Sequence, residues 1–118
     1  MTAAKRAGAL FETAIVRHLR ERGLTAERLP KAGANDEGDV VFEDANGSRF
    51  VAELKVRREK TTQLSLGAFL AEAERESLAY ASARLLHDGA PIPVVFVKRS
   101  NKPLDETFVV LRLKDFIA

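Results

Sequence analysis

The sequence predicts an α/β fold in which a mixed β-sheet is flanked by helices, and three observations support this class. With 118 residues, 46% of them hydrophobic and 31% charged, the chain can bury one core and is too short for two. Its apolar residues follow a helical period in two stretches and a strand period in the others. A helix before a run of strands and another within it is typical of helices packed on a sheet. We therefore expect one domain over residues 1–118, in the order α-β-β-β-α-β-β-(α).

The chain is expected to begin with a helix over residues 3–22. Apolar residues recur there with a period of 3.6, and Gly23 occupies the position that follows a helix end. A weak strand over residues 25–29 ends at Pro30. A polar, glycine-rich loop follows over residues 31–38.

Two strands come next, over residues 39–43 and 49–56. They flank Asn46-Gly47, a dipeptide typical of β-hairpin turns, so we expect them to pair antiparallel. Residues 57–63 are charged and polar.

The second half of the chain should add a long helix and two more strands. Residues 64–86 have a helical apolar stripe, and Gly89 with two prolines follows them. Residues 93–98 form a short apolar run of the kind found in buried strands. A last strand is expected over residues 107–112, and residues 113–118 are expected to form one closing turn.

The composition excludes several classes of protein. The chain has no cysteine, which excludes a disulfide scaffold, a thiolate zinc site and a cysteine nucleophile. No apolar run approaches the roughly 20 residues of a membrane span, and the first ten residues do not resemble a secretory signal. We therefore expect a soluble, cytoplasmic (intracellular) protein with no membrane partner. The net charge of +2 indicates that any nucleic acid is bound by local patches.

The strand over residues 49–56 carries a carboxylate and an ammonium group on one face. Alternation places Glu53 and Lys55 on the same side, about 6.5 Å apart. The opposite face is apolar and comprises Phe50, Ala52, Leu54 and Val56. Because burying either charge alone is costly, this pair is unlikely to be arbitrary.

Two more carboxylates can approach this pair. Asp39 opens the preceding strand, and the antiparallel hairpin brings it near Glu53 and Lys55. Glu12 falls on the core side of the first helix. Converging carboxylates repel one another unless a cation lies between them or one binds a proton. Oxygen ligands without cysteine or paired histidine favour Mg²⁺ or Mn²⁺ over zinc.

Basic residues could contact a phosphate backbone at two places. Arg57, Arg58 and Lys60 directly follow the lysine of this strand, and Lys31 lies in the glycine-rich loop. On the first helix a basic ridge is expected on the side opposite Glu12, formed by Arg6, Thr13, Arg17 and Arg20. Arg57, Arg58 and Lys60 can equally form an ordinary solvated loop.

At these residues a resemblance becomes specific. Gly38-Asp39, thirteen intervening residues and Glu53-Leu54-Lys55 resemble the PD-(D/E)XK nuclease motif. Together with Glu12, the glycine-rich loop, the long helix and the strand over residues 92–98, the whole chain resembles the archaeal-type and phage Holliday junction resolvases. The family's proline before the aspartate is replaced here by Gly38. Gln63 is similar to a glutamine that some relatives carry after the lysine.

The resemblance implies a restriction-endonuclease-like fold and a homodimeric endonuclease that cuts branched double-stranded DNA with Mg²⁺, for which Mn²⁺ can substitute. It implies that Asp39, Glu53 and the main-chain carbonyl of Leu54 bind the metal. Lys55 would be the catalytic lysine, and Glu12 would support the metal or the attacking water.

Simpler interpretations remain open. Glu12 can be a helix carboxylate paired with Lys5 or Arg22, Asp39 can cap the loop, and Glu53 with Lys55 can be a structural ion pair. At the level of function, the alternatives are a non-catalytic DNA-binding or assembly module on the same fold, and a flap- or nick-directed repair nuclease. The persistence of Asp39, Glu53 and Lys55 together favours an enzyme. A chain of this length has no room for a separate target-recognition domain.

Overall fold

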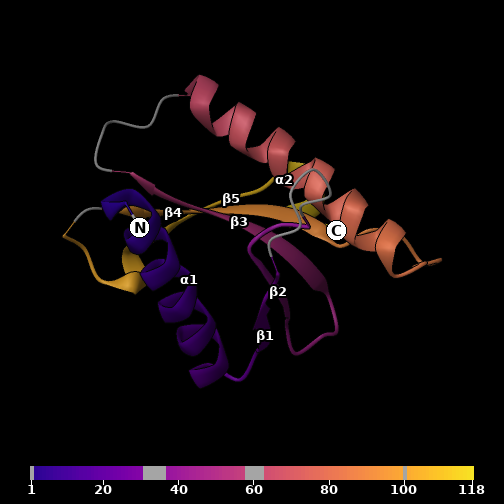
Figure 1. Cartoon of the computed structure of the whole chain (residues 1–118). Coiled ribbons are helices and arrows are strands. Elements are labelled where there is room, and N and C mark those ends of the chain that lie inside the picture. The colour runs from indigo at the N-terminus through magenta and orange to yellow at the C-terminus, as the bar shows by residue number, and fades with distance from the viewer. Residues whose placement is uncertain (1, 31–36, 58–62, 100) are drawn as a thin grey trace.

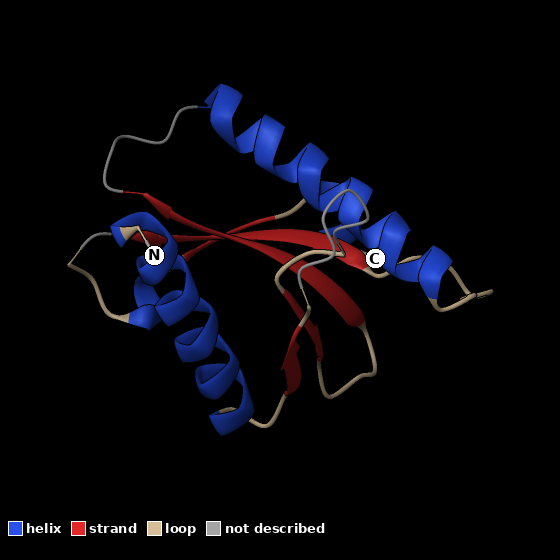
Figure 2. Cartoon of the chain, viewed as in Figure 1, coloured by secondary structure: helices blue, strands red, loops and turns tan. Residues whose placement is uncertain are grey.

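The structure is a computed structural model that describes residues 2–30, 37–57, 63–99 and 101–118. Its sheet has five strands in the order β1-β2-β3-β4-β5. Helices α1 and α2 cover opposite faces of this sheet (Figure 1, Figure 2). The predicted α/β class, with a mixed sheet between helices, is confirmed. The elements are α1 (Ala3–Glu21), β1 (Thr25–Arg28), β2 (Val40–Glu43), β3 (Arg49–Arg57), α2 (Gln63–Ala83), β4 (Ile92–Arg99), the 3₁₀ turn η2 (Leu104–Glu106), β5 (Phe108–Val110) and α3 (Leu113–Phe116).

The sheet is mixed because one connection is a crossover. Strands β1, β2 and β3 pair antiparallel in sequence order, and β4 pairs antiparallel with β5. Strands β3 and β4 are parallel, and α2 connects them across one face of the sheet. Because strands that run in the same direction need such a long connection, α2 is placed directly over β3 and β4.

The β2–β3 hairpin forms as its turn residues predict. Gly47 has a φ of +81°, which favours glycine. Asp44 stabilises the turn, since its Oδ1 accepts hydrogen bonds from the amides of Asn46 and Ser48, both at 2.9 Å. Glu43 therefore lies opposite Arg49, and this register fixes every pair along β2 and β3.

The face of the sheet covered by α1 holds the main apolar core. The helix begins at Thr2, whose Oγ1 accepts a hydrogen bond from the amide of Lys5 at 3.1 Å. The apolar face of β3 packs here, as its alternation predicted. The fully buried members of this core are Phe11, Ile15, Val16, Ala26, Val40, Phe42, Ala52, Val94 and Phe96.

The face covered by α2 has two smaller apolar clusters. One joins Phe69, Leu70 and Ala73 of the helix to Val95 and Val97 of β4. The other contains Leu29, Val51 and Tyr80. Since Val51 packs on this side, Glu53 and Lys55 face α2.

Several predicted boundaries shift by a few residues. Strand β1 ends at Arg28, β2 starts at Val40 rather than at residue 39, and β5 covers only Phe108–Val110. Helix α2 ends at Ala83 because Leu85 adopts a left-handed φ of +52°, which a helix cannot continue through. The 3₁₀ turn η2 was not predicted.

Within the described residues, no helix combines the length and the apolar character that a bilayer crossing requires.

Candidate functional site

Asp39 lies one residue before β2, where β3 continues past the end of its antiparallel neighbour. The amide of Asp39 donates to the carbonyl of Ala52 at 3.0 Å. Its side chain then takes the place of the missing strand, because Oδ2 accepts a hydrogen bond from the amide of Leu54 at 2.8 Å. In a β-strand the N–H and C=O of one residue point to the same edge. The Leu54 carbonyl is therefore directed toward the edge where the Asp39 carboxylate lies.

Gly38 explains why the chain has no proline before Asp39. Its φ is +103°, whereas a proline ring holds φ near −65°. A Cβ atom at this position would lie 2.7 Å from Cγ1 of Val51. Glycine at this position is thus required by the backbone conformation and by the close packing of this segment.

The segment before Asp39 is attached to the end of α2. The carboxylate of Glu37 pairs with Arg84 at 2.6 Å. The Arg84 guanidinium lies over the ring of Tyr80, 3.7 Å from its centre. Helix α2 therefore helps to hold Asp39 at the edge of β3.

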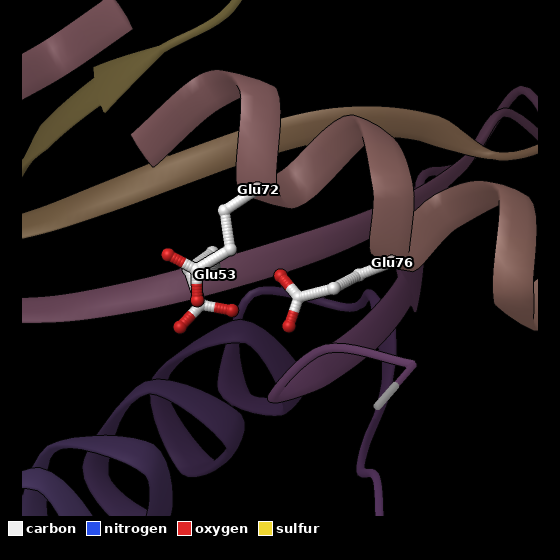
Figure 3. Close-up of side chains that lie close together, drawn as sticks. All are labelled: Glu53, Glu72 and Glu76. Atoms are coloured by element: carbon white, nitrogen blue, oxygen red, sulfur yellow. The ribbon is translucent and has the colours of Figure 1, made fainter. Parts of the chain in front are cut away.

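Helix α2 also brings two acids to Glu53. Carboxylate oxygens of Glu53, Glu72 and Glu76 all lie within 4.8 Å of one another. Figure 3 shows these side chains pointing into one region, Glu53 from β3 and the other two from successive turns of α2. Glu53 and Glu76 are buried, with 7% and 4% of their surface exposed.

The sequence analysis missed Glu72 and Glu76 as site residues. A signal for Glu76 was present, because it follows Phe69 and Ala73 along the buried stripe of the helix and precedes Tyr80. A carboxylate at an apolar position of a helix was the same signal that singled out Glu12. Glu72 lies one turn before Glu76, so the two share a side of α2.

The surroundings of Glu53 disfavour a negative charge. Burial, followed by the neighbouring carboxylates of Glu76 and Asp39, raises the pKa of Glu53 to about 10. Among the described residues, Oε2 of Glu53 has no hydrogen-bond partner. A buried carboxylate in this position requires either a proton or a cation at its free oxygen. The acids of this cluster offer only oxygen ligands, which suit a hard divalent ion.

Lys55 lies beside this cluster, on the face that the strand alternation predicted. Its Nζ is 3.1 Å from Oε1 of Glu72 and 3.6 Å from Oε1 of Glu53. The ammonium group also lies 4.9 Å from the centre of the Phe69 ring. The lysine is therefore half-buried, held between two carboxylates and an aromatic face.

Glu12 is buried on the other helix and pairs with Arg28 of β1 at 3.2 Å. Arg28 was not among the partners expected for Glu12 from the sequence. Arg22, which was expected, pairs instead with Asp105. Among the described residues, Glu12 is not one of the three acids whose oxygens lie within 4.8 Å of one another.

The basic ridge of α1 was expected on the side of the helix opposite Glu12, but it adjoins Glu12 instead. Arg28 donates to the Thr13 hydroxyl at 3.4 Å with one nitrogen and to Glu12 at 3.2 Å with the other, so the ridge and the acid meet at this arginine. Arg6 and Arg17 are exposed. A groove beside the ridge is lined by Thr13, Val16, Arg17, Arg20, Glu21 and Arg28.

Of the remaining predicted DNA contacts, Arg57 is the one that falls within the described residues. Arg57 is the last residue of β3, and Gln63 is the first residue of α2. Lys31, Arg58 and Lys60 lie outside the described residues.

Comparison with known proteins gives a likeness among solved structures. No family model matches the chain, and no curated protein sequence matches it. Among solved structures, the fold is similar to that of Hjc, a Holliday junction resolvase from the archaeal hyperthermophile Archaeoglobus fulgidus. The TM-score is 0.53 at 16% sequence identity, and the alignment covers 89% of this chain and 88% of the resolvase. The chain therefore has a fold like that of an archaeal resolvase, over nearly its whole length.

Proposed function

We propose that this chain is a divalent-metal-dependent endonuclease that hydrolyses phosphodiester bonds in branched double-stranded DNA, as Holliday junction resolvases do. The observation that carries the proposal is the buried Glu53, which has Asp39 and Lys55 beside it and one oxygen without a partner in the described structure. The likeness in fold to an archaeal resolvase supports it. In this proposal residues 1–118 form one nuclease domain with a PD-(D/E)XK site.

The residues at the edge of β3 fit a Mg²⁺ ion. Asp39 and Glu53 would hold it, and the Leu54 carbonyl is directed toward the same edge as the Asp39 carboxylate. Mn²⁺ has the same preference for oxygen ligands and would substitute. When bound, a divalent ion of this kind activates water and stabilises the charge that develops on the phosphate.

The chain's own groups then have separate roles. Lys55, held beside Glu53, would orient the attacking water or offset negative charge in the transition state. Its contact with Glu72 fixes where the ammonium group lies. Glu12, buried and paired with Arg28, would support the site from α1.

The DNA backbone would be bound by basic residues near these acids. Arg57, Arg58 and Lys60 follow Lys55 along the chain, and Lys31 belongs to the loop before Asp39. Arg6 and Arg17 extend this surface along α1. Arg28 contacts both Thr13 of the ridge and Glu12, so the ridge adjoins Glu12.

A homodimer would suit this substrate, because two symmetric cuts in a junction need two sites. The edge strand β5 and helix α3 offer a surface for it, with five large apolar side chains more than half exposed. These are Phe108, Val109, Leu113, Phe116 and Ile117.

The test is cleavage of a labelled four-way junction and a matched linear duplex, with Mg²⁺ and with EDTA. We expect the junction to be cut only with Mg²⁺. Binding without cleavage in Mg²⁺ and in Mn²⁺ would instead identify a non-catalytic DNA-binding module. A flap substrate cut in preference to the junction would indicate a repair nuclease.

A further inference from the structure

We propose that Glu76 of α2 is a third carboxylate ligand of the metal site, so that the site is completed by a helix as well as by β3 and the residue before β2. This inference rests on the proposed site of Asp39 and Glu53 and extends it to a residue that the nuclease motif does not include. It also gives a role to the most deeply buried acid of the described structure.

The geometry brings the carboxylate of Glu76 close to that of Glu53. Oxygens of Glu53 and Glu76 belong to the group that lies within 4.8 Å, and Figure 3 shows both side chains directed into the same region. A second, independent observation comes from Glu53, whose Oε2 is buried and has no hydrogen-bond partner among the described residues. One cation between the two side chains would satisfy that oxygen.

The other acids on α2 differ in how their charge is compensated. Glu74 lies on another side of the helix and makes a bidentate pair with Arg112, at 2.6 and 2.9 Å. Glu72 accepts a hydrogen bond from Lys55 at 3.1 Å. Glu76 lies beside Glu53, with carboxylate oxygens of the two side chains within 4.8 Å of each other. Of the three, Glu76 is the one that is both buried and next to Glu53, which makes it the candidate ligand.

The charges of the site agree with a divalent ion. Four carboxylates gather at or near Glu53, namely those of Asp39, Glu53, Glu72 and Glu76, and Lys55 is the ammonium group among them. Lys55 offsets about one of these charges. A divalent cation compensates most of the remainder without requiring any carboxylate to be protonated.

Ser77, the residue after Glu76, has a structural role that does not involve the Glu76 carboxylate. Ser77 is as deeply buried as Glu76, and its hydroxyl donates a hydrogen bond to the carbonyl of Pro91. Ser77 thus anchors α2 to the segment that begins β4. The attachment of α2 to the loop before Asp39 comes from Glu37 and Arg84. The carboxylate of Glu76 is not needed for either link.

The test is calorimetric binding of Mn²⁺ alone to the full chain, for wild type, Glu76→Gln and the matched control Glu74→Gln. We expect Glu76→Gln to weaken Mn²⁺ binding by at least about tenfold, because one charged ligand is lost. Glu74→Gln should bind within about twofold of wild type, since its carboxylate pairs elsewhere. Melting in EDTA should show Glu76→Gln to be about as stable as wild type, because glutamine keeps the size of the side chain and its amide can still form hydrogen bonds.

Two results would overturn the inference. Mn²⁺ binding by Glu76→Gln within twofold of wild type would exclude Glu76 as a ligand. A Glu76→Gln protein that is unfolded or markedly less stable in EDTA would assign the carboxylate to the metal-free fold. Glu53→Gln separates this inference from the proposed function: if that variant binds Mn²⁺ like wild type, the metal site itself is wrong, whatever Glu76 does.

Discussion

The two faces of the sheet are built differently, although each is covered by one long helix. Under α1 the buried apolar residues form one continuous cluster that extends from the helix across β1, β2, β3 and β4. Under α2 they form two separate clusters, one at Phe69 and one at Tyr80. The acids Glu72 and Glu76 lie between these two positions along the helix.

The contrast extends to the buried acids themselves. Glu12 on the α1 side has an arginine at 3.2 Å, whereas Glu53 on the α2 side has Lys55 at 3.6 Å and several carboxylates as neighbours. The continuous apolar core under α1 therefore stabilises the fold. Under α2 the apolar core is interrupted, and charged side chains occupy the space between its two parts. Unfavourable clusters of this kind are typical of functional sites, where neighbours shift pKa values for a purpose.

The largest expected effect tests the acids of the α2 face directly. Asp39→Asn and Glu53→Gln should each reduce junction cleavage by at least about a thousandfold, because the loss of a metal ligand removes several kcal/mol of transition-state stabilisation. Junction binding, measured by gel shift, should persist or become tighter, since a negative charge near the phosphate is removed. Cleavage near the wild-type rate in either variant would contradict the site assignment.

Lys55→Ala should have the next largest effect, a fall in the cleavage rate of about two to four orders of magnitude. The lysine is proposed to act on the water or on the developing charge, so Mn²⁺ binding by calorimetry should remain. If this variant unfolds, the lysine serves instead as a structural ion pair between Glu53 and Glu72.

Glu72→Gln should reduce cleavage by about tenfold, because Glu72 acts by holding Lys55 and the amide can still accept one hydrogen bond. A double-mutant cycle distinguishes this role from a general loss of stability. In a Lys55→Ala background, Glu72→Gln should have almost no further effect on the rate. Equal effects of Glu72→Gln in both backgrounds would mean that it does not act through Lys55.

The sequence predicted which residues of the strands face each side of the sheet. Period-2 alternation placed Val51, Glu53 and Lys55 on one face and Ala52 on the other, because a strand has only two faces. The Asn46-Gly47 turn fixed the register that brings Asp39 to Glu53. The mixed sheet followed from the order of the elements.

The contribution of the helices was harder to predict. The apolar stripe of α2 turns Glu76 toward the sheet, but whether Glu72 or Glu76 meets Glu53 also depends on how α2 is positioned along β3, which no local pattern specifies. The same holds for Arg28, whose contacts with Glu12 and Thr13 join elements far apart in the chain. The glycine at position 38 was explained only by its φ and by the proximity of Val51.

A smaller effect concerns stability and pH in the absence of metal. Because the pKa of Glu53 is raised from 4.5 to about 10, its contribution to stability is present below about pH 4.5 and is lost as pH rises toward 10. At pH 8 in EDTA, Glu53→Gln should therefore melt higher than wild type by about 5 °C, a shift of roughly 1 to 2 kcal/mol. The difference should shrink at pH 5, and Mg²⁺ should stabilise wild type more than the variant.

This measurement contrasts with the same change on the α1 face. Glu12→Gln weakens an ion pair with Arg28, so it should lower the melting temperature in EDTA rather than raise it. If Glu53→Gln and Glu12→Gln both melted at a lower temperature than wild type in EDTA, other groups of the metal-free protein would have to compensate the negative charges near Glu53.

The smallest effect should appear in the DNA contacts. Arg57 ends β3 two residues after Lys55, so neutralising Arg57 and Arg58 together should flatten the dependence of junction affinity on salt by about one to two units of the log–log slope. Arg6 and Arg17 on α1 should contribute less, because the described contacts beside the ridge lead to Glu12, which is not one of the three clustered acids. Junction affinity at several salt concentrations, measured for both double variants, tests the order. A larger change of slope for the Arg6 and Arg17 variant would place the main DNA path along α1.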